Sequence, residues 1–350
     1  SADSGPTAGV TTDWQLRVGG ARPPVVSDGT VFVGGQESVR AVDAASRDEQ
    51  WATGISDAET PLVSTPAVTS RSVFVGSVAE PEGTVHALDV ATGEQRWSVS
   101  FSIGTDSTGG TPPSPLVSDG TVYVVGETTV YALDAVTGDE RWRSEPGGIF
   151  DLSRTALADG TVYVNVDGTL YALDAATGDE EWAADTTQEV TIPAVADGTV
   201  YVGQGREVRA IRAADGSERW RFEAGREVVV LSPAVAGGTV FAGTFKTASD
   251  EFAHGLYALD AADGSEEWRV EVESSSPSYI GIRPAVDDGS VYAGRGTLGG
   301  SGDNSLVAFD PDTGTEQWRS TFEDVVRGPA VAMGSVFVAP GGTLYRLTEG

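Results

Sequence analysis

The sequence contains no cysteine, a single lysine (Lys246) and only two histidines (His86 and His254) among its 350 residues. The absence of cysteine excludes disulfides, thiolate metal sites and cysteine nucleophiles. Two histidines in unlike contexts argue against a histidine-rich metal centre. No apolar run approaches the roughly 18 residues that a spanning helix needs, so we expect no direct membrane insertion.

Positive charge is also scarce: 22 basic residues stand against 52 acidic ones, and the formal net charge is −30. Nucleic acids and anionic membrane surfaces bind clustered Lys and Arg, so neither is an expected partner. Apolar residues make up 39% of the chain, so it can bury a sizeable core and the acidity belongs to a solvated surface. The near-absence of lysine beside abundant Asp and Glu resembles proteins of extreme halophiles, which stay soluble in molar salt.

An eleven-residue pattern that ends in tryptophan repeats along the whole chain. Clear copies end at Trp97, Trp142, Trp182, Trp268 and Trp318, and weaker copies end at Trp51 and Trp220. Successive copies are 38 to 50 residues apart, so the insertions vary while the unit does not. A fixed unit of this size is typical of repeat architectures, in which each unit buries its apolar face only against its neighbours.

One unit reads as four short strands. A strand after a proline, such as 193–195, is followed by an Asp-Gly turn and by Thr199-Val-Tyr-Val, whose alternation and β-branched residues favour a strand. A variable loop, a third strand such as 170–173 and a tight hairpin from Asp174 to Gly178 lead to the tryptophan strand. No apolar 3.6-residue period exceeds one turn, so helices should be nearly absent. The sequence therefore predicts an all-β, eight-bladed β-propeller with four antiparallel strands per blade.

The last unit lacks its tryptophan strand, because the chain stops at Gly350 soon after the third strand 344–347. Residues 13–18, which include Trp14, are claimed by no other unit. We expect them to form the outer strand of the last blade and to close the ring, since an open array would leave two sheet faces exposed. Residues 1–12 are small and polar and are expected to form a flexible tether before a single propeller that spans 13–350.

The repeat resembles the tryptophan-docking motif of the quinoprotein-type, PQQ-like β-propeller family, most clearly at Ala87, Asp89, Thr92, Gly93 and Trp97. The resemblance covers residues 11–350. It implies that each tryptophan packs between neighbouring blades near the glycine of the turn, which gives a structural role to Trp14, Trp51, Trp97, Trp142, Trp182, Trp220, Trp268 and Trp318.

Some copies depart from the motif, and there we expect less regular docking. The departures lie at Ser46-Arg47, at Arg212 and at the two Asp-Gly forms, 215–216 and 263–264.

The family contains both enzymes and non-catalytic members. Its PQQ-dependent alcohol dehydrogenases usually carry adjacent cysteines over the quinone, a Ca²⁺ site of Glu, Asn and Asp, and a catalytic Asp. This chain has no cysteine and only two asparagines, Asn165 and Asn304, and the calcium ligands match no position in it. We therefore expect a non-catalytic, BamB-like scaffold that binds a protein partner or small ligand and needs no cofactor. The alternatives are a quinoprotein dehydrogenase with PQQ and Ca²⁺, and a ligand-sensing ectodomain.

The resemblance also implies an extracytoplasmic address, secreted or lipid-anchored, for a propeller that we expect to be monomeric. Binding is expected on the face that carries the variable loops, because loop variation on one rim is where specificity is normally built. These loops are 76–84, 101–114, 145–154, 243–255, 273–283 and 295–305.

Two groups of residues on the loop face are candidate binding sites. Arg22, Arg154, Arg283 and Arg327 each precede an innermost strand, where they would ring the mouth of the central channel and hold an anion by bidentate bonds. Pairing of each arginine with acidic loop neighbours is the alternative. Asp303 and Asn304 are weak candidates for Ca²⁺, in a glycine-rich segment that lacks the spaced carboxylates of a calcium loop.

One further loop, around Lys246 and His254, contains an acid and base pair but no nucleophile or metal triad, so a solvated loop is the favoured interpretation there.

Overall fold

The structure is a computed structural model. It describes residues 9–20, 22–55, 63–79, 82–103, 112–148, 150–186, 190–225, 228–246, 254–272, 278–280, 283–287, 289–297 and 304–349. For residues 79, 150–154, 246, 254, 272, 278–280 and 297 it describes the backbone alone.

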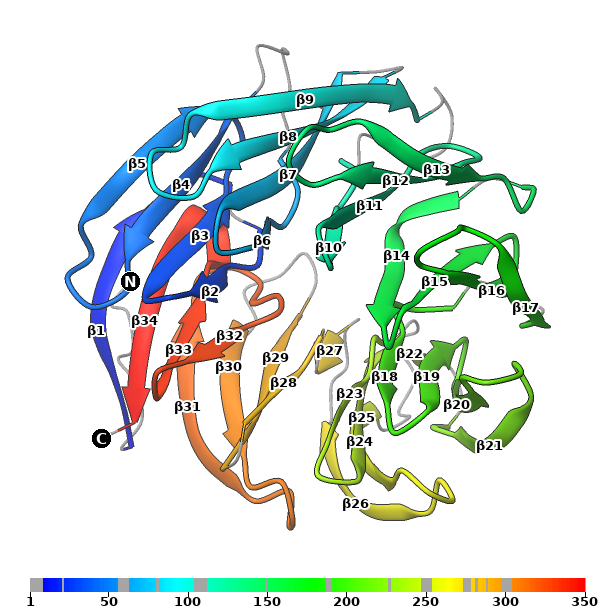
Figure 1. Ribbon diagram of the computed structural model, residues 1–350. Coiled ribbons are helices and arrows are strands. Elements are labelled where there is room, and N and C mark those ends of the chain that lie inside the picture. The colour runs from blue at the N-terminus through cyan, green and yellow to red at the C-terminus, as the bar shows by residue number, and fades with distance from the viewer. Residues whose placement is uncertain are drawn as a thin grey trace. The chain divides into compact units, whose positions relative to one another are not determined.

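The chain folds into an eight-bladed β-propeller whose blades are four-stranded antiparallel sheets (Figure 1). In the described residues the sole helical element is the 3₁₀ turn Pro340–Gly342. The prediction of fold class from the repeat is therefore confirmed. The chain divides into two compact units, residues Leu16–Thr187 and residues Gln188–Gly350 together with Ser1–Gln15.

The unit of residues Leu16–Thr187 contains blades 1 to 4. Blade 1 consists of β2 (Val25–Ser27), β3 (Thr30–Gly34), β4 (Ser38–Asp43) and β5 (Glu49–Gly54). Blade 2 consists of β6 (Ala67–Val68), β7 (Ser72–Ala79), β8 (Glu82–Asp89) and β9 (Gln95–Ser102). Blade 3 consists of β10 (Leu116–Ser118), β11 (Thr121–Val125), β12 (Val130–Asp134) and β13 (Glu140–Ser144). Blade 4 consists of β14 (Phe150–Ala158), β15 (Thr161–Val166), β16 (Thr169–Asp174) and β17 (Glu180–Asp185).

The other unit contains blades 5 to 8. Blade 5 consists of β18 (Ala194–Ala196), β19 (Thr199–Gln204), β20 (Glu207–Arg212) and β21 (Glu218–Glu223). Blade 6 consists of β23 (Ala234–Ala236), β24 (Thr239–Lys246), β25 (His254–Asp260) and β26 (Glu266–Val272). Blade 7 consists of β28 (Ala285–Val286), β29 (Val291–Thr297), β30 (Asn304–Phe309) and β31 (Glu316–Phe322). Blade 8 consists of β32 (Ala330–Ala332), β33 (Ser335–Val338), β34 (Thr343–Glu349) and β1 (Val10–Arg17).

The N-terminal strand β1 completes the last blade, as the sequence predicts, because it pairs with β34 at the outer edge of that sheet. It begins at Val10, three residues before the expected start at Asp13, and ends at Arg17. The expected tether 1–12 therefore overlaps the strand. Val10 is buried in an apolar cluster with Leu306, Trp318 and Leu347, which explains why the strand starts there.

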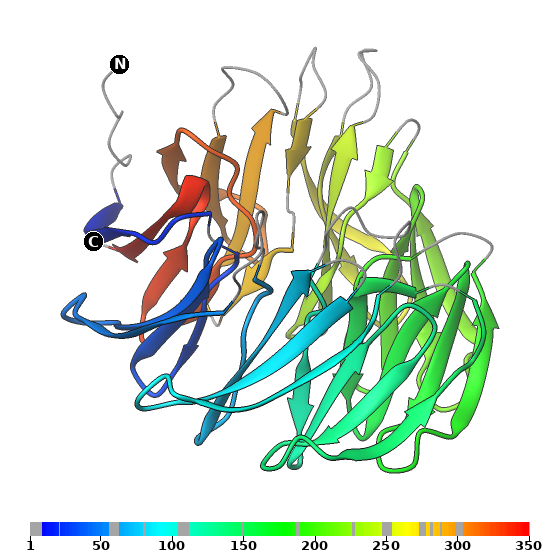
Figure 2. The same ribbon diagram turned by 90° about the horizontal axis from the view of Figure 1, so that it is seen from above.

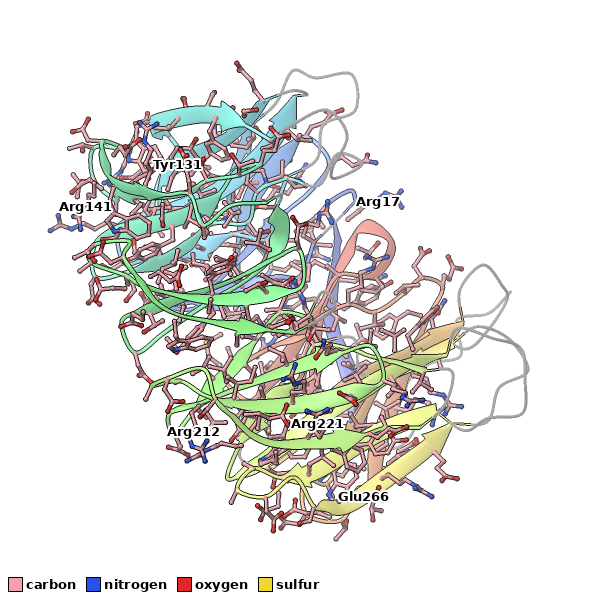
Figure 3. The ribbon with its side chains drawn as sticks, turned by 90° about the vertical axis from the view of Figure 1, so that its right-hand side faces the viewer. Arg17, Tyr131, Arg141, Arg212, Arg221 and Glu266 are labelled. Carbon is pink, nitrogen blue, oxygen red and sulfur yellow. The ribbon has the colours of Figure 1, made fainter. Side chains whose placement is uncertain are left out.

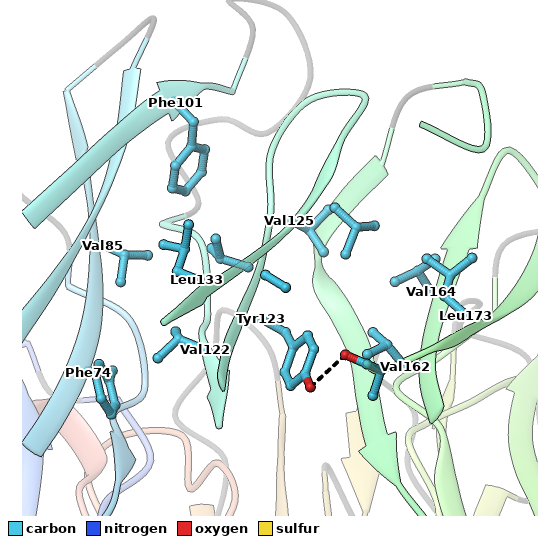
Figure 4. Close-up of a cluster of buried hydrophobic side chains, with 14 of the residues drawn as sticks. Phe74, Val85, Phe101, Val122, Tyr123, Val125, Leu133, Val162, Val164 and Leu173 are labelled. Carbon is cyan, nitrogen blue, oxygen red and sulfur yellow. Dashed lines mark hydrogen bonds between the residues drawn. The ribbon is translucent and has the colours of Figure 1, made fainter. Parts of the chain in front are cut away.

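Every blade stacks an aromatic residue of its second strand on the tryptophan of its own outer strand. The ring centroids lie 5.8 to 6.1 Å apart in all eight blades, a distance typical of offset or tilted aromatic pairs. In blade 3 the pair is Tyr123 and Trp142, and both donate a hydrogen bond to the backbone carbonyl of Ala175 in blade 4, at 2.9 and 3.0 Å (Figure 4, dashed line from Tyr123). The tryptophan therefore joins the core of one blade to the turn of the next.

In most blades one aspartate and one glycine build the five-residue hairpin before the outer strand, as in blade 4. Asp174 accepts hydrogen bonds from the amides of Ala176 and Thr177 at 2.9 and 2.8 Å, and Gly178 has φ of +78°. A Cβ at Gly178 would lie 2.5 Å from the Trp142 ring of the preceding blade. Glycine is thus required there both for the left-handed backbone and for close approach of the tryptophan.

The departing copies of the turn retain its backbone, although Arg212 in blade 5 has no carboxylate that could accept from the turn amides. At Asp263-Gly264 the preceding tryptophan, Trp220, donates to Ala261 at 3.0 Å and Gly264 has φ of +75°, so the expectation of irregular docking there is wrong. Arg47 takes the glycine position of blade 1 with φ of +71°, and its amide still bonds to the Asp43 carbonyl at 3.0 Å. The backbone of the turn is stable enough to hold a side chain in the left-handed region.

Blade 7 meets a different acceptor, because blade 8 is split between the two ends of the chain and has no such hairpin. The carboxylate of Glu349, at the end of β34, accepts from Trp318 Nε1 at 2.9 Å and from the Tyr292 hydroxyl at 3.2 Å. A side chain here replaces the turn carbonyl that the other described tryptophan bonds use. Burial is the main cause that raises the pKa of Tyr292 above its ordinary value. The hydroxyl therefore stays protonated and can donate this hydrogen bond.

Candidate functional site

The two ends of each blade differ in what they offer a partner. At the turn end, seven short hairpins repeat. In six of them an aspartate carboxylate accepts hydrogen bonds from the turn amides, and in the seventh Arg212 stands at the position of that aspartate. Charged side chains such as Arg141, Arg212 and Arg221 point outward from these turns and outer strands (Figure 3). The opposite end, the loop end, carries the insertions, and 31 of the 68 residues in the six predicted variable loops lie outside the described part of the chain.

At the loop end, the segments that enter blades 2, 3, 6 and 8 pack against the second strand of the blade before them. Gly76 ends a Val-Phe-Val-Gly run in β7, and a Cβ there would overlap the carbonyl oxygen of Pro113, which leads into blade 3. A Cβ at Gly294 of blade 7 would likewise overlap the carbonyl oxygen of Val326, which leads into blade 8. Glycines at 34, 203 and 243 take the equivalent position in other blades. This recurring glycine is visible in the sequence, but the repeated pattern that ends in tryptophan does not include it.

In the unit of residues 188–350 the loop end is extended by two strands that the sequence did not predict. β22 (Val228–Val230) pairs with the end of β24, and β27 (Ser278–Ile280) pairs with both β24 and β29. β27 thereby joins blades 6 and 7 into one ten-stranded sheet. Figure 2 shows the strand ends of this part of the chain, yellow-green to orange, projecting at the same end of this unit. Val229 on β22 is 39% exposed, an apolar side chain presented by this added sheet.

The four candidate arginines have different surroundings. Arg22 is half-buried, and its Nε donates to the carbonyl of Val63 at 3.2 Å in the segment entering blade 2. Arg283 is half-buried with φ of +51°, and Arg327 is exposed. The side chain of Arg154 lies outside the described part. No described contact joins any two of them, so the anion site at the channel mouth stays a prediction.

The described residues near the candidate Ca²⁺ site do not converge on one ion. Asp303 lies outside the described residues. Asn304 is buried and donates to the Glu323 carbonyl at 3.0 Å, while its Oδ1 and the hydroxyl of Ser305 have no partner. Adjacent residues of a strand point to opposite faces, so these two oxygens do not converge on one ion. Among the described residues no three His, Cys, Asp or Glu side chains gather as a metal set would.

A buried hydrogen-bonded chain in blade 2 has the order hydroxyl, imidazole, amide. Ser77 Oγ lies 2.9 Å from His86 Nε2, and His86 Nδ1 lies 3.0 Å from Gln95 Oε1. The acceptor Gln95 Oε1 assigns the proton to Nδ1, so Nε2 accepts from the serine. This resembles the order of an activated nucleophile, but Ser77 is 6% and His86 8% exposed. Enclosure of the hydroxyl within the sheet favours a structural role.

Acidification should destabilise the fold through His86. Burial lowers the pKa of His86 below its ordinary value of 6.5, and the Gln95 bond opposes this only in part. The unfolded chain therefore binds the proton more readily, and the stability contributed by the neutral imidazole is lost as pH falls through and below 6.5. We expect the free energy of unfolding of His86→Gln to depend less on pH between about 7.5 and 5.5 than that of the parent, measured by denaturant titration.

Val136→Gln, at an exposed hairpin position of blade 3, is the control and should retain the full dependence of the parent. Parallel curves for the parent and His86→Gln over this range would contradict the assignment.

The comparison with protein families decides the classification. The chain matches the family described as outer membrane protein assembly factor BamB over residues 7–124, 35–148, 81–246, 126–297 and 253–350, which together span almost the whole sequence. The chain belongs to this family.

Solved structures with the same fold include BamB-family and enzyme members. BamB from Moraxella catarrhalis has 16% identity and a TM-score of 0.71, with 97% of each chain covered. The computationally designed Ika8 protein has 16% identity and a TM-score of 0.71, with 96% and 98% covered. Quinohemoprotein alcohol dehydrogenase from Comamonas testosteroni has 15% identity and a TM-score of 0.67, with 97% of this chain and 76% of the enzyme covered. These identities establish similarity of fold alone.

A comparison with curated protein sequences gives no match. Among the described residues, no helix has the length and hydrophobicity that a membrane crossing requires.

Proposed function

We propose that this BamB-family propeller is a non-catalytic scaffold of the cell envelope that binds a protein partner through the loop end of its blades. The family and the similar fold of BamB from Moraxella catarrhalis support the assignment to an assembly factor of the envelope. A halophilic origin, with solubility in molar salt, fits the net charge of −30.

The observation that carries the proposal is the added sheet at the loop end of blades 6 and 7. Turns at the other end are short and repeat nearly the same five residues, so they offer little to distinguish one partner from another. At the loop end, β22 and β27 lengthen the blades and bind neighbouring loops together by backbone pairing. Backbone pairing holds the strands of this surface in fixed positions, and the exposed side chain of Val229 offers a partner an apolar contact on it.

Site-specific cross-linking tests the proposal, and the natural absence of cysteine makes single-cysteine variants unambiguous. Val229→Cys places a photoreactive maleimide at the loop end, and Val136→Cys places it in a hairpin at the turn end, where that valine is 65% exposed. In envelope preparations of the source cells at both low and molar salt, Val229→Cys should give a discrete protein adduct and Val136→Cys should not. The same adduct from both positions, or none from Val229→Cys, would contradict the proposal.

A second measurement distinguishes the scaffold from a quinoprotein dehydrogenase. Addition of PQQ with Ca²⁺ should change neither the melting temperature of the protein nor the visible spectrum of the quinone, because the proposed scaffold binds neither of them. A rise in melting temperature with a dye-linked alcohol oxidation would favour the enzyme instead.

A further inference from the structure

The outer strand of blade 2, β9, is an edge of the propeller without the carboxylates that the other outer strands carry. Its sequence, Gln-Arg-Trp-Ser-Val-Ser-Phe-Ser, contains no Asp or Glu. Each of the other seven outer strands contains at least one carboxylate. The residues that supply these carboxylates are Asp13, Glu49, Glu140, Glu180, Glu181, Asp185, Glu218, Glu223, Glu266, Glu267, Glu271 and Glu316.

The one charge on β9 is neutralised within the blade. Arg96 forms an ion pair with Asp89 of the preceding turn. That hydrogen bond, together with bonds from the backbone amides of Thr92 and Ala91, lowers the pKa of Asp89 to about 2. The carboxylate therefore stays ionised at any ordinary pH, and β9 presents a neutral strip on a chain whose net charge is −30.

β9 also projects further than the outer strands beside it. It continues to Ser102, five residues beyond Trp97, whereas β5 and β13 end three and two residues beyond their own tryptophans. In Figure 1 it is the long cyan strand that lies outside β8. The carbonyl of Ser102 accepts from the amide of Glu127 in blade 3 at 3.0 Å, so the free edge runs from Arg96 to Phe101.

The two sides of this edge have distinct chemistry. On one side, Val99 is half-buried and Phe101 lies 5.4 Å from the Tyr131 ring, measured between centroids. On the other side, Ser98 and Ser100 expose hydroxyls, and Ser100 Oγ lies 2.8 Å from Thr84 Oγ1. A strand laid along β9 would find apolar side chains at alternate positions and hydroxyl groups at those between.

We propose that β9 binds an extended segment of another polypeptide, which adds as a fifth strand to blade 2. Edge strands offer unpaired amides and carbonyls, and soluble proteins normally block them with charge. The carboxylates on seven outer strands and their absence from the eighth indicate that this one edge is left open to pair. The partner segment is free of carboxylates, alternates aliphatic and hydroxyl side chains, and is flanked by basic residues that complement the surrounding acidity. A second copy of this chain is the less suitable occupant, since pairing two β9 strands brings two bodies of charge −30 together. The proposal does not depend on the loop-end site.

The test uses a fluorescent nonapeptide, Lys-Thr-Val-Thr-Val-Thr-Val-Thr-Lys, and the whole chain. Fluorescence anisotropy should show binding to the parent. Ser98→Glu with Ser100→Glu should weaken that binding at least about tenfold, because the two carboxylates face the approaching strand. Ala52→Glu with Ala183→Glu is the matched control. It adds the same charge at exposed positions of β5 and β17 and should bind as the parent does.

Two further readouts locate the interaction. Hydrogen–deuterium exchange should slow in residues 96–101 when the peptide binds, and a peptide with N-methylated alternate amides should not bind. No binding by the parent at about 1 mM peptide overturns the proposal. Equal binding by both double variants, or dimerisation of the parent through β9 in sedimentation experiments, overturns it too.

Discussion

Deleting residues 1–17 should lower the free energy of unfolding by at least about 3 kcal/mol, because it removes the whole of β1 from blade 8. Val10 leaves the apolar cluster that contains Leu306, Trp318 and Leu347. The hydrogen bond of 2.8 Å between Thr348 and Asp13, and the 3.5 Å ion pair between Arg346 and Asp13, are also lost. Denaturant titration followed by tryptophan fluorescence measures the change.

Shorter deletions test at which residue β1 begins. Removing residues 1–8 stops before β1 and should leave stability unchanged. Removing residues 1–12 takes Val10 and Thr11, with its 3.0 Å hydrogen bond to Thr348, and should cost an intermediate amount. If the deletion of 1–12 proved as harmless as that of 1–8, the strand would start at Asp13, as the sequence alone suggested.

Gly264→Ala should destabilise the protein by about 3 kcal/mol, the sum of a left-handed backbone and an overpacked tryptophan contact. Gly264 has φ of +75°, and the added Cβ would lie 2.5 Å from Trp220 Cε3. Gly198→Ala is the matched control in the same unit. Its φ is +68° and its Cβ would meet nothing within 4 Å, so the cost should be about 1 kcal/mol, the backbone contribution alone.

A double-mutant cycle isolates the tryptophan contact. Trp220→Ala by itself should cost about 3–5 kcal/mol, since it removes a side chain that is 8% exposed and a 3.0 Å bond to Ala261. In that background Gly264→Ala should cost only about as much as Gly198→Ala, because the ring that it would strike is gone. Strict additivity of the two substitutions would show that the ring does not press on the turn.

The candidate sites were less accessible to sequence reasoning than the fold. Arg22, Arg154, Arg283 and Arg327 each precede an inner strand, and the anion site at the channel mouth stays a prediction, while Arg22 bonds to the Val63 carbonyl. Position along a strand does not determine which group a long side chain reaches. The hydrogen-bonded chain of Ser77, His86 and Gln95 was missed for the same reason, since its members come from three strands whose register the sequence does not state. The absence of carboxylates from residues 95–102 is visible in the sequence. It becomes informative only once the structure shows that these residues form an outer strand.

Blade number, strand type, turn chemistry and the borrowing of the N-terminal strand all followed from the sequence alone. Each depends on local chemistry that repeats: a β-branched strand, an aspartate that satisfies two amides, a glycine with positive φ and a tryptophan at constant spacing. Only the tertiary structure decided the start of β1 at Val10, the joining of blades 6 and 7 by β27, and the use of Glu349 as the acceptor for Trp318. These depend on register and on contacts between segments far apart in the chain. Such contacts form between surfaces that remain unpaired once the repeated units have folded. The sequence of a single repeat does not determine which surfaces these are.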